Sequence, residues 1–315
     1  MNESHSSIAV VIPAYRVAAQ ISDVIARVPS GVRDIIVVDD ASPDGLQQVL
    51  AQVSEPRLVI VRHEVNRGVG GAMKTGFRMA LELGADIIVK IDGDGQMDPA
   101  LLAQFVEPIT SGEADFTKGN RFDDLSFIRR MPVVRRLGNL ALSFLVKLAS
   151  GYWNMFDPCN GYIALRSRVL RRVNLDRVAD RYFFEISLLC EAYFAKAVLQ
   201  DIPMQPVYAG ETSSLSPLGS ATEFAPRLCW RALYRLVTGY FMRDFNVVSV
   251  FMFVGMPTLA FGIVWSVYHW VQTFRLQVAA ATGTVMIGVL AIVLGFQLLL
   301  QAIVLDVGNE PRRNR

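Results

Sequence analysis

Hydrophobic positions in the first 120 residues occur in short runs that are separated by amphipathic segments. Four of these runs are rich in Val and Ile, and they span residues 8–12, 35–38, 58–62 and 87–91. Short apolar runs of this composition predict strands, and the run over residues 87–91 predicts one that is buried on both faces, as parallel strands are. The segments between them have helical spacing. The sequence therefore predicts an α/β domain over residues 1–222, with a mostly parallel, doubly wound sheet and helices on both faces.

Two long apolar stretches follow near the C-terminus. Residues 245–274 and 276–305 contain no Asp, Glu, Lys or Arg, and Arg275 separates them. Each stretch exceeds the ~20 residues that an α-helix needs to cross a bilayer. Two buried core helices are the alternative, but two such stretches in succession favour a transmembrane hairpin over residues 245–305.

Arginines predict the orientation of this hairpin. Those at its ends are Arg227, Arg231, Arg235 and Arg243 before it, and Arg312, Arg313 and Arg315 after it. Only Arg275 lies in the connection. By the positive-inside rule, the N-terminal domain and a tail over residues 306–315 both face the cytoplasm. The polar first seven residues have no signal-peptide core, so we expect a multi-pass protein of the cytoplasmic membrane.

Two amphipathic segments lie between the predicted sheet and the hairpin. Over residues 127–153, apolar and basic positions recur on opposite sides of a helix that ends at Tyr152 and Trp153. This pattern predicts a helix in a membrane interface, although an ordinary helix packed on the sheet has the same pattern. Over residues 223–244 an arginine recurs every four residues, which suits anionic head groups or snorkelling at the membrane surface.

Composition and charge exclude several classes of protein. The net charge is only +2, which gives no basis for general nucleic-acid binding. The three cysteines are widely spaced and include no Cys-x-x-Cys pair, as expected for free thiols in a reducing compartment and not for a zinc site. The three histidines, His5, His63 and His269, form no catalytic or ligand pattern.

Candidate chemistry follows the fourth predicted strand. Asp92 and Asp94 come just past its C-terminal end, where ligands bind in open α/β sheets, and they alternate with glycines. Two carboxylates at this spacing can hold one hard divalent cation, which typically clamps a diphosphate. An Asp/Gly turn between strand and helix has the same composition and is the alternative.

A glycine-rich loop over residues 66–71 opens the helix after the third predicted strand. Its spacing matches neither the P-loop nor the dinucleotide fingerprint, which disfavours P-loop NTPases and dehydrogenases. The loop is typical of a backbone site for a phosphate or nucleotide at a helix N-terminus, or of a tight strand-to-helix turn.

Six motifs occur in one order over about 160 residues. They span residues 11–15, 38–45, 66–72, 92–99, 118–122 and 157–162. In this combination the chain resembles glycosyltransferase family 2. It is most similar to the polyprenyl-phosphate branch, which includes dolichyl-phosphate mannose synthases and bacterial undecaprenyl-phosphate sugar transferases. The resemblance implies a GT-A fold with a Rossmann-like sheet. Residues 207–215 depart from the branch, because they lack its Arg and have Ser214 where a Lys is expected.

The resemblance also implies roles for particular residues. The nucleotide sugar would be bound by Pro13, Tyr15, Asp40, Asp44, Asp92, Asp157 and Glu185. For Glu185, a sugar contact and a structural hydrogen bond both stay open. Mg²⁺ or Mn²⁺ would be bound by Asp92, Asp94 and Gln96, and Asp94 would be catalytic in this way. Arg121, Arg135 and Arg136 would face the acceptor phosphate, for which arginine is the best-shaped side chain.

The resemblance predicts an enzyme that transfers one sugar, with inversion, from a UDP- or GDP-hexose to polyprenyl monophosphate at the cytoplasmic face of the membrane. A phosphate acceptor is already an anionic nucleophile, so no general base is required. One alternative is a processive polysaccharide synthase, but residues 226–230 do not match its Gln-x-x-Arg-Trp motif. A transferase that extends a lipid-linked oligosaccharide and a non-catalytic membrane scaffold are the others. A homo-oligomer through the spans is left open.

Overall fold

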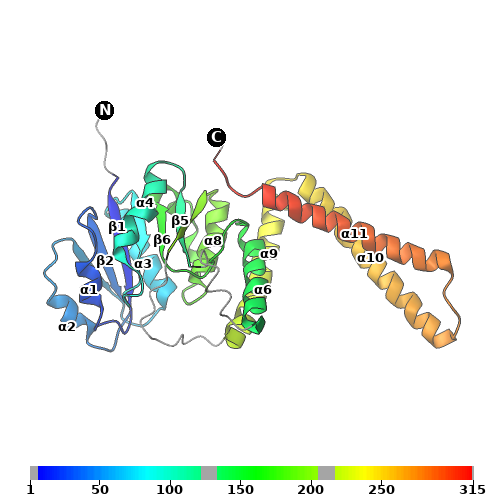
Figure 1. The fold of residues 1–315 in the computed structure, drawn as a ribbon, viewed down its shortest axis with the longest axis horizontal. Coiled ribbons are helices and arrows are strands. Elements are labelled where there is room, and N and C mark those ends of the chain that lie inside the picture. Colours follow the sequence, from blue (N-terminus) through cyan, green and yellow to red (C-terminus); the bar gives the residue numbers. More distant parts are fainter. Residues whose placement is uncertain (1–5, 122–132, 205–216, 314–315) are drawn as a thin grey trace. The chain divides into compact units, whose positions relative to one another are not determined.

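The computed structural model describes residues 6–121, 133–204 and 217–313 (Figure 1). At residues 133–135, 137, 139 and 217–223 it describes the backbone alone. The chain divides into two compact units. The first comprises Met1–Arg231 together with Pro311–Arg315, and the second comprises Ala232–Glu310.

The first unit is built on a seven-stranded sheet of order β3-β2-β1-β4-β6-β5-β7. The strands are β1 (Ile8–Ala14), β2 (Asp34–Asp39), β3 (Leu58–Arg62), β4 (Ile87–Lys90), β5 (Phe116–Asn120), β6 (Ile163–Arg166) and β7 (Leu199–Pro203). β6 is antiparallel to β4 and β5, and the other pairs are parallel. The predicted mostly parallel sheet is confirmed, and its first four strands are those predicted from the apolar runs.

Helices cover both faces of this sheet (Figure 1). α1 (Ile21–Ala26), α2 (Leu46–Ala51) and α4 (Leu102–Thr110) share one core with Val10 and Ile12 of β1. α3 (Val69–Glu82) packs on the other face, next to α8 (Phe184–Phe194). Because side chains alternate along a strand, Val11 points to this second face. A Cβ on Gly76 would lie 2.2 Å from Val11, so the glycine lets α3 approach the sheet closely.

The remaining helical elements of this unit are α6 (Val133–Ser150), α7 (Ser167–Leu170), the first part of α9 (Pro217–Val237) and two 3₁₀ turns (Pro99–Leu101 and Leu175–Arg177). In α6, Val146 and Ala149 are buried, whereas Leu140 and Phe144 are 62% and 48% exposed. The predicted interface helix thus packs one end on the domain and leaves large apolar side chains exposed. Its predicted start, residues 127–132, lies outside the described residues.

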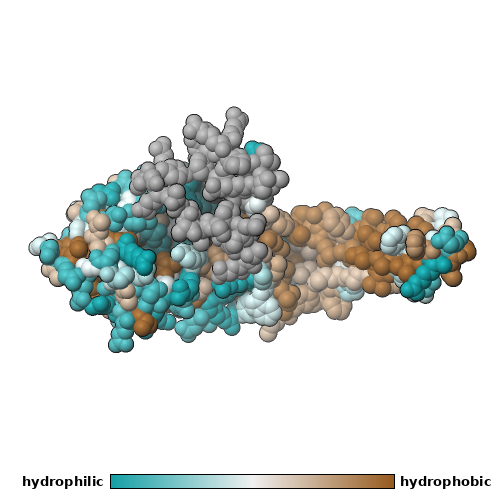
Figure 2. Space-filling view, turned by 90° about the horizontal axis from the view of Figure 1, so that it is seen from below, coloured by the Kyte–Doolittle hydropathy of each residue, from teal (hydrophilic) through white to brown (hydrophobic). Residues whose placement is uncertain are grey.

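The second unit contains a hairpin of two long helices, α10 (Val247–Leu276) and α11 (Thr282–Gly308), which a π-helix (Thr238–Arg243) precedes. Both are long and apolar enough to cross a membrane, with mean hydropathies of 2.2 and 2.4. Glycines bring them together, because a Cβ on Gly262 would lie 2.7 Å from the Ile292 nitrogen and one on Gly295 2.5 Å from the Leu259 nitrogen. Figure 2 shows a mostly hydrophobic outer surface. The predicted pair of apolar C-terminal helices is confirmed.

Two arginines of the predicted basic stripe form ion pairs with carboxylates of the protein itself. Arg231 pairs with Glu191 of α8 at 2.8 Å, within the first unit. Arg235 lies in the second unit, where its guanidinium makes two 2.7 Å hydrogen bonds to Asp306 of α11. The interpretation that these two arginines face anionic head groups is therefore wrong, because the sequence did not show that each has a buried carboxylate partner far along the chain.

Candidate active site

The C-terminal ends of β1, β2 and β4 lie side by side at one edge of the sheet. Tyr15 follows β1, Asp40 follows β2, and Asp92 lies two residues beyond β4. In open α/β sheets this edge binds ligands. The structure therefore brings three of the six motifs to one place.

The loops after β1 and β2 are tied together by hydrogen bonds. The Ser42 hydroxyl donates to Asp44 Oδ1 at 2.6 Å and accepts the Arg16 N–H at 2.7 Å. Asp44 Oδ2 accepts the Ala18 N–H at 2.9 Å. Burial opposes the charge, but the hydrogen bonds from Ser42 and Ala18 hold the pKa of Asp44 below its ordinary value. Asp44 is thus an ionised group that fixes the loop after β1.

This pair of loops is conformationally strained. Arg16 and Ala41 have φ angles of +58° and +55°, a region that residues with a side chain seldom occupy. Such strain concentrates at functional sites. Tyr15, next to the strained Arg16, is 41% exposed, and the Arg16 guanidinium lies 5.3 Å from the centre of its ring. Pro13 is half-buried within β1, whereas Tyr15 and Asp44, two other predicted nucleotide contacts, are exposed.

Asp40 lies beneath the loops and is buried. Its carboxylate accepts the N–H groups of Arg67 (2.8 Å) and Gly68 (2.7 Å) and a hydrogen bond from His63 Nδ1 (2.7 Å). His63 Nε2 in turn lies 2.9 Å from the Thr75 hydroxyl. The structure thus places Asp40 as a support for the glycine loop, and it gives the buried His63 a structural role.

The glycine loop serves close packing. A Cβ on Gly70 would lie 2.0 Å from the Ala179 carbonyl oxygen, and one on Gly68 2.6 Å from that of Asp180. The Gly71 N–H donates to the Asp180 carbonyl at 3.0 Å. Because the Gly68 and Gly71 N–H groups are both bound internally, the tight turn describes the loop better than a phosphate cradle. The glycines admit the segment that leads into α8.

Asp92, Asp94 and Gln96 are all half-buried in the turn after β4. Asp94 Oδ1 accepts the Gln96 N–H at 2.9 Å, and Gly95 has a φ of +78°, which favours glycine. Asp98 ends the turn by accepting the Ala100 N–H at 3.0 Å. The turn is therefore a defined structure that presents oxygen atoms, so the turn and cation interpretations describe one and the same segment.

The donor set suits a hard cation. Two carboxylates with an amide oxygen match Mg²⁺ or Mn²⁺, which in nucleotide sites take one or two carboxylates and complete their coordination with phosphate oxygens and water. In the part of the chain that the structure describes, no three His, Cys, Asp or Glu side chains form a metal cluster. Because two carboxylates and one amide oxygen fill only part of the coordination sphere of such a cation, the residues present fit one that arrives with a diphosphate.

Charged side chains are buried beneath this turn. Lys90, only 1% exposed, places Nζ 2.6 Å from Asp92 Oδ1 and 3.7 Å from Glu185 Oε1. Burial opposes its charge, but Asp92 and Glu185 raise the pKa of Lys90 above its ordinary value. Burial raises the pKa of Glu185 and lowers that of a second buried lysine, Lys118. Lys118 donates to the Asn160 carbonyl.

Arg121, directly after β5, is held by Asp157. The Arg121 Nε lies 2.7 Å from Asp157 Oδ2, and a terminal nitrogen of its guanidinium lies 3.1 Å from Oδ1. Asp157 is 1% exposed, whereas Arg121 is 40% exposed. A two-point ion pair of this kind fixes the plane of the guanidinium. Asp157, predicted to contact the nucleotide sugar, thus orients the predicted phosphate arginine.

The two other predicted phosphate arginines, Arg135 and Arg136, lie in the first turn of α6. The Arg136 side chain is half-buried, and the Arg135 side chain lies outside the described residues. The loop over residues 207–215 lies outside them too.

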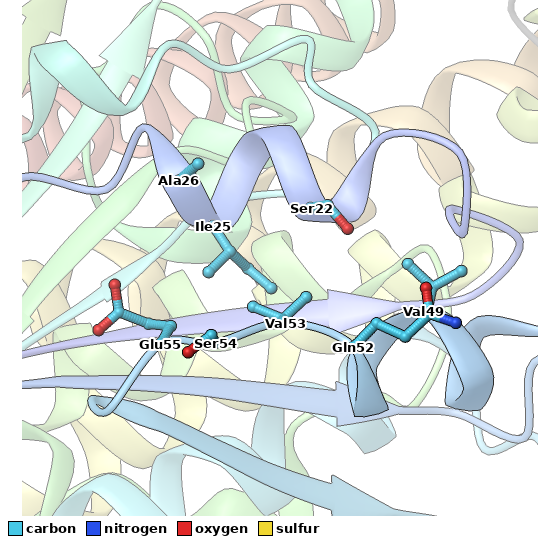
Figure 3. Close-up of a pocket in the computed structure, with 8 residues that line it drawn as sticks. All are labelled: Ser22, Ile25, Ala26, Val49, Gln52, Val53, Ser54 and Glu55. Atoms are coloured by element: carbon cyan, nitrogen blue, oxygen red, sulfur yellow. The ribbon is translucent and has the colours of Figure 1, made fainter.

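Two hollows of the domain are not lined by the candidate site residues Asp92, Asp94 and Arg121. One, of about 450 Å³, opens between α1 and α2, and the lining side chains in Figure 3 include Ile25, Val53 and Glu55. The Glu55 carboxylate is paired with Arg57 at 2.8 Å. The other, of about 480 Å³, lies along α3 and contains the ion pair of Lys74 with Asp180.

A mixed α/β sheet with an Asp-x-Asp turn at its carboxyl edge defines a protein of the GT-A-like class. Residues 9–173 match the model of Glycosyl transferase family 2. This match covers more than half of the chain, and the chain belongs to that family.

Curated relatives act on polyprenyl phosphates, according to their names. Over 213 residues the chain is 31% identical to the UDP-N-acetylglucosamine–dolichyl-phosphate N-acetylglucosaminyltransferase of Methanococcus voltae. This match covers 63% of this chain and 84% of that protein. It is 30% identical to the undecaprenyl-phosphate mannosyltransferase of Micrococcus luteus over 56% of this chain and 74% of the other.

The solved structures that are similar support the fold. Glucosyl-3-phosphoglycerate synthase from Mycobacterium tuberculosis, in complex with Mn²⁺ and uridine-diphosphate-glucose, superposes with a TM-score of 0.52 at 22% identity. The match covers 72% of this chain and 79% of the other. At this identity the likeness shows a shared GT-A-like fold.

Sequence reasoning missed three buried polar residues near the site, Lys90, Lys118 and His63. Lys90 gave a signal, since a lysine that ends an otherwise apolar central strand needs a buried partner. The signal for Lys118 was weaker, because β5 was not predicted as a strand.

Proposed function

We propose that this protein transfers a single sugar from a UDP- or GDP-sugar to polyprenyl monophosphate at the cytoplasmic face of the membrane, with inversion at the anomeric carbon. The main support is that an Asp-x-Asp-x-Gln turn at the ligand-binding edge and two helices long enough to span a membrane occur on one chain. The names of the relatives agree with a polyprenyl-phosphate acceptor.

In this proposal Asp92, Asp94 and Gln96 hold Mg²⁺ or Mn²⁺, which when bound neutralises the charge of the departing nucleoside diphosphate. An acceptor phosphate oxygen forms the new bond to the anomeric carbon as the bond to the diphosphate breaks. The guanidinium of Arg121, oriented by Asp157, attracts that phosphate. Because the acceptor is already anionic, the chain's contribution is to position charges, and no side chain has to remove a proton.

The exposed apolar residues of α6 suit the same acceptor. Leu140 and Phe144 are exposed on a helix whose C-terminal end, with Val146 and Ala149, is buried in the domain, and Phe156 is 61% exposed nearby in sequence. Large apolar side chains on one face of a helix favour contact with the acyl boundary of a bilayer. We propose that α6 lies in the membrane interface, where the domain contacts the phosphate of the acceptor lipid.

The test offers the full chain in membranes a panel of nucleotide sugars with undecaprenyl phosphate and analyses the extracted lipid by mass. A sugar monophosphate lipid formed from one donor is the expected product. Product found only on a lipid diphosphate would overturn the acceptor assignment. Failure of every donor to bind, with or without Mn²⁺, would favour a scaffold.

The variant Asp94→Ala tests the cation site. Its turnover should fall to under about 1% of the wild type, because loss of a ligand to a charge-neutralising cation removes several kcal/mol of transition-state stabilisation. Asp23→Ala, which removes an exposed carboxylate from α1, is the control and should keep full activity. Membrane insertion and the melting temperature of Asp94→Ala should equal those of the wild type. More than a few per cent of residual turnover would remove the assignment.

A further inference from the structure

Two buried lysines point from the sheet towards the N-terminus of α8. Lys90 of β4 and Lys118 of β5 both pair in register with Ile163 of the strand between them. Adjacent strands lie about 4.8 Å apart, so the two lysines stand about 10 Å apart in one row across the sheet. Glu185, in the first turn of α8, faces this row and is 3.7 Å from Lys90 Nζ.

The face on which the row stands follows from the strand pleat. Ile87 and Val89 belong to the core shared with α1 and α4, so Lys90 must point to the opposite face, where α8 lies. In β5, Thr117 donates a hydrogen bond to the Phe105 carbonyl of α4, so Lys118 points away from α4 as well. The two ammonium groups are thus placed by the register of the sheet.

Lys90 links two parts of the candidate site. Its ammonium donates to Asp92 Oδ1 at 2.6 Å and to the Gly161 carbonyl at 3.1 Å. Gly161 belongs to the segment after Asp157, which holds Arg121. A Cβ on Gly161 would lie 2.4 Å from Lys90 Nζ and 2.8 Å from Asp92 Oδ2, so the lysine, the carboxylate and this backbone meet tightly.

Stability gives no reason for a lysine here. A central strand that is buried on both faces favours an apolar residue at this position, and replacing a buried ion pair by apolar side chains is often neutral or stabilising. Lys90 is only 1% exposed, so it does not touch the donor or the acceptor. Of its two charged contacts, Asp92 Oδ1 at 2.6 Å is much closer than Glu185 Oε1 at 3.7 Å, and only Asp92 belongs to the turn that would hold the cation. The charge of Lys90 therefore acts most directly on Asp92.

We infer that Lys90 is a positioning residue that holds Asp92 by one oxygen and weakens the affinity of the Asp92–Gln96 turn for its cation, so that the cation binds and leaves with the nucleotide. This inference rests on the proposed function. Lys90 keeps one oxygen of Asp92 occupied and adds a positive charge beside the cation. A like charge at this distance disfavours a divalent ion, even at the effective dielectric constant of a protein.

Lys90→Met tests the inference, because methionine fills the same space without charge. Mn²⁺ binding is measured by electron paramagnetic resonance, with and without UDP, on the full chain in detergent. We expect Lys90→Met to bind Mn²⁺ about tenfold more tightly without nucleotide, since a repulsive charge is removed, and to turn over about tenfold more slowly, since Asp92 loses its orientation. A merely structural role would weaken both properties together.

Lys118→Met is the matched control. It removes a second buried ammonium from the same row, one that donates to the Asn160 carbonyl and not to Asp92. Its Mn²⁺ affinity should stay within about twofold of the wild type. If Lys118→Met tightens Mn²⁺ binding as much as Lys90→Met, the effect is general and the role of Lys90 is overturned.

The outcomes separate this inference from the proposed function. A wild type that binds no Mn²⁺ with any nucleotide contradicts the cation site itself. A wild type that binds Mn²⁺, with Lys90→Met at the same or weaker affinity, contradicts the role of Lys90 alone. If Lys90→Met does not fold, as judged by its melting curve, Lys90→Gln gives the same decision, because glutamine keeps a hydrogen-bond donor and lacks the charge.

Discussion

The ion pair between Arg235 and Asp306 gives a prediction about stability that differs from the one drawn from the sequence, in which Arg235 lies at the membrane surface. Both side chains are almost fully buried, 1% and 3% exposed, and two parallel 2.7 Å hydrogen bonds join them. The Tyr240 hydroxyl donates to the same carboxylate. If Arg235 served anionic head groups, neutralising Asp306 would have little effect on stability. If the pair is a brace inside the second unit, the effect is large.

The expected magnitude follows from the geometry. Asp306→Asn leaves a buried guanidinium without its counter-charge, and removing one partner of a buried pair costs about 3–5 kcal/mol. For a chain of this size this corresponds to a fall in melting temperature of roughly 6–20 °C. Replacing both partners, as in Arg235→Met with Asp306→Leu, should recover most of the loss, because the apolar pair leaves no buried charge.

The assay is thermal unfolding of the detergent-solubilised chain, followed by circular dichroism at low and high salt. Arg275→Met is the control, since Arg275 is exposed at the end of α10, and it should change stability by less than about 0.5 kcal/mol. The loss in Asp306→Asn should persist at high salt, because buried pairs are little screened. A loss below about 1 kcal/mol, or one that salt abolishes, would refute the brace.

Two further predictions concern the first unit. Burial raises the pKa of Asp201 to about 6, so its contribution to stability is present below about pH 4 and is lost as the pH rises through 6. Asp201→Asn keeps the acceptor for the Phe156 N–H and removes the buried charge. It should therefore add about 1–3 kcal/mol to the unfolding free energy at pH 7 and almost nothing at pH 4, as measured by urea titration. Equal gains at both pH values would contradict this. Gly70→Ala should lower stability by about 1–3 kcal/mol, since its Cβ would lie 2.0 Å from the Ala179 carbonyl oxygen, whereas Gly31→Ala, with nothing within 4 Å, should be close to neutral in the same titration.

The sequence predicted the half of the sheet whose signals are local. β1 to β4 each contain a continuous run of apolar residues, and such runs predict strands without knowledge of their neighbours. β5, Phe116–Asn120, contains a lysine, a glycine and an asparagine, yet all five residues are buried. Its strand character depends on partners that come much later in the chain, namely β6, β7 and the acid on α8. No window of sequence around residue 118 contains that information.

The same limit applied to the candidate site. The Asp92–Gln96 turn could be located because it combines an apolar strand, an edge position and a characteristic local composition. The resemblance then assigned several carboxylates to the nucleotide sugar, and the structure adds that two of them, Asp40 and Asp157, are buried and hydrogen-bonded within the domain. The sequence does not distinguish a carboxylate that accepts backbone N–H groups from one that binds a ligand.

The acidic residues of the site therefore fall into two sets with different physical demands. Asp40 and Asp157 are buried, and each accepts hydrogen bonds from backbone and side-chain donors, so replacing either leaves buried donors without partners. Asp92 and Asp94 are half-buried in a turn that presents their oxygens. Under the proposed function, we expect substitution in either set to lower activity, through the scaffold for Asp40 and Asp157 and through the cation for Asp92 and Asp94. Loss of activity alone does not identify a ligand in this fold, whereas loss of activity at an unchanged melting temperature does.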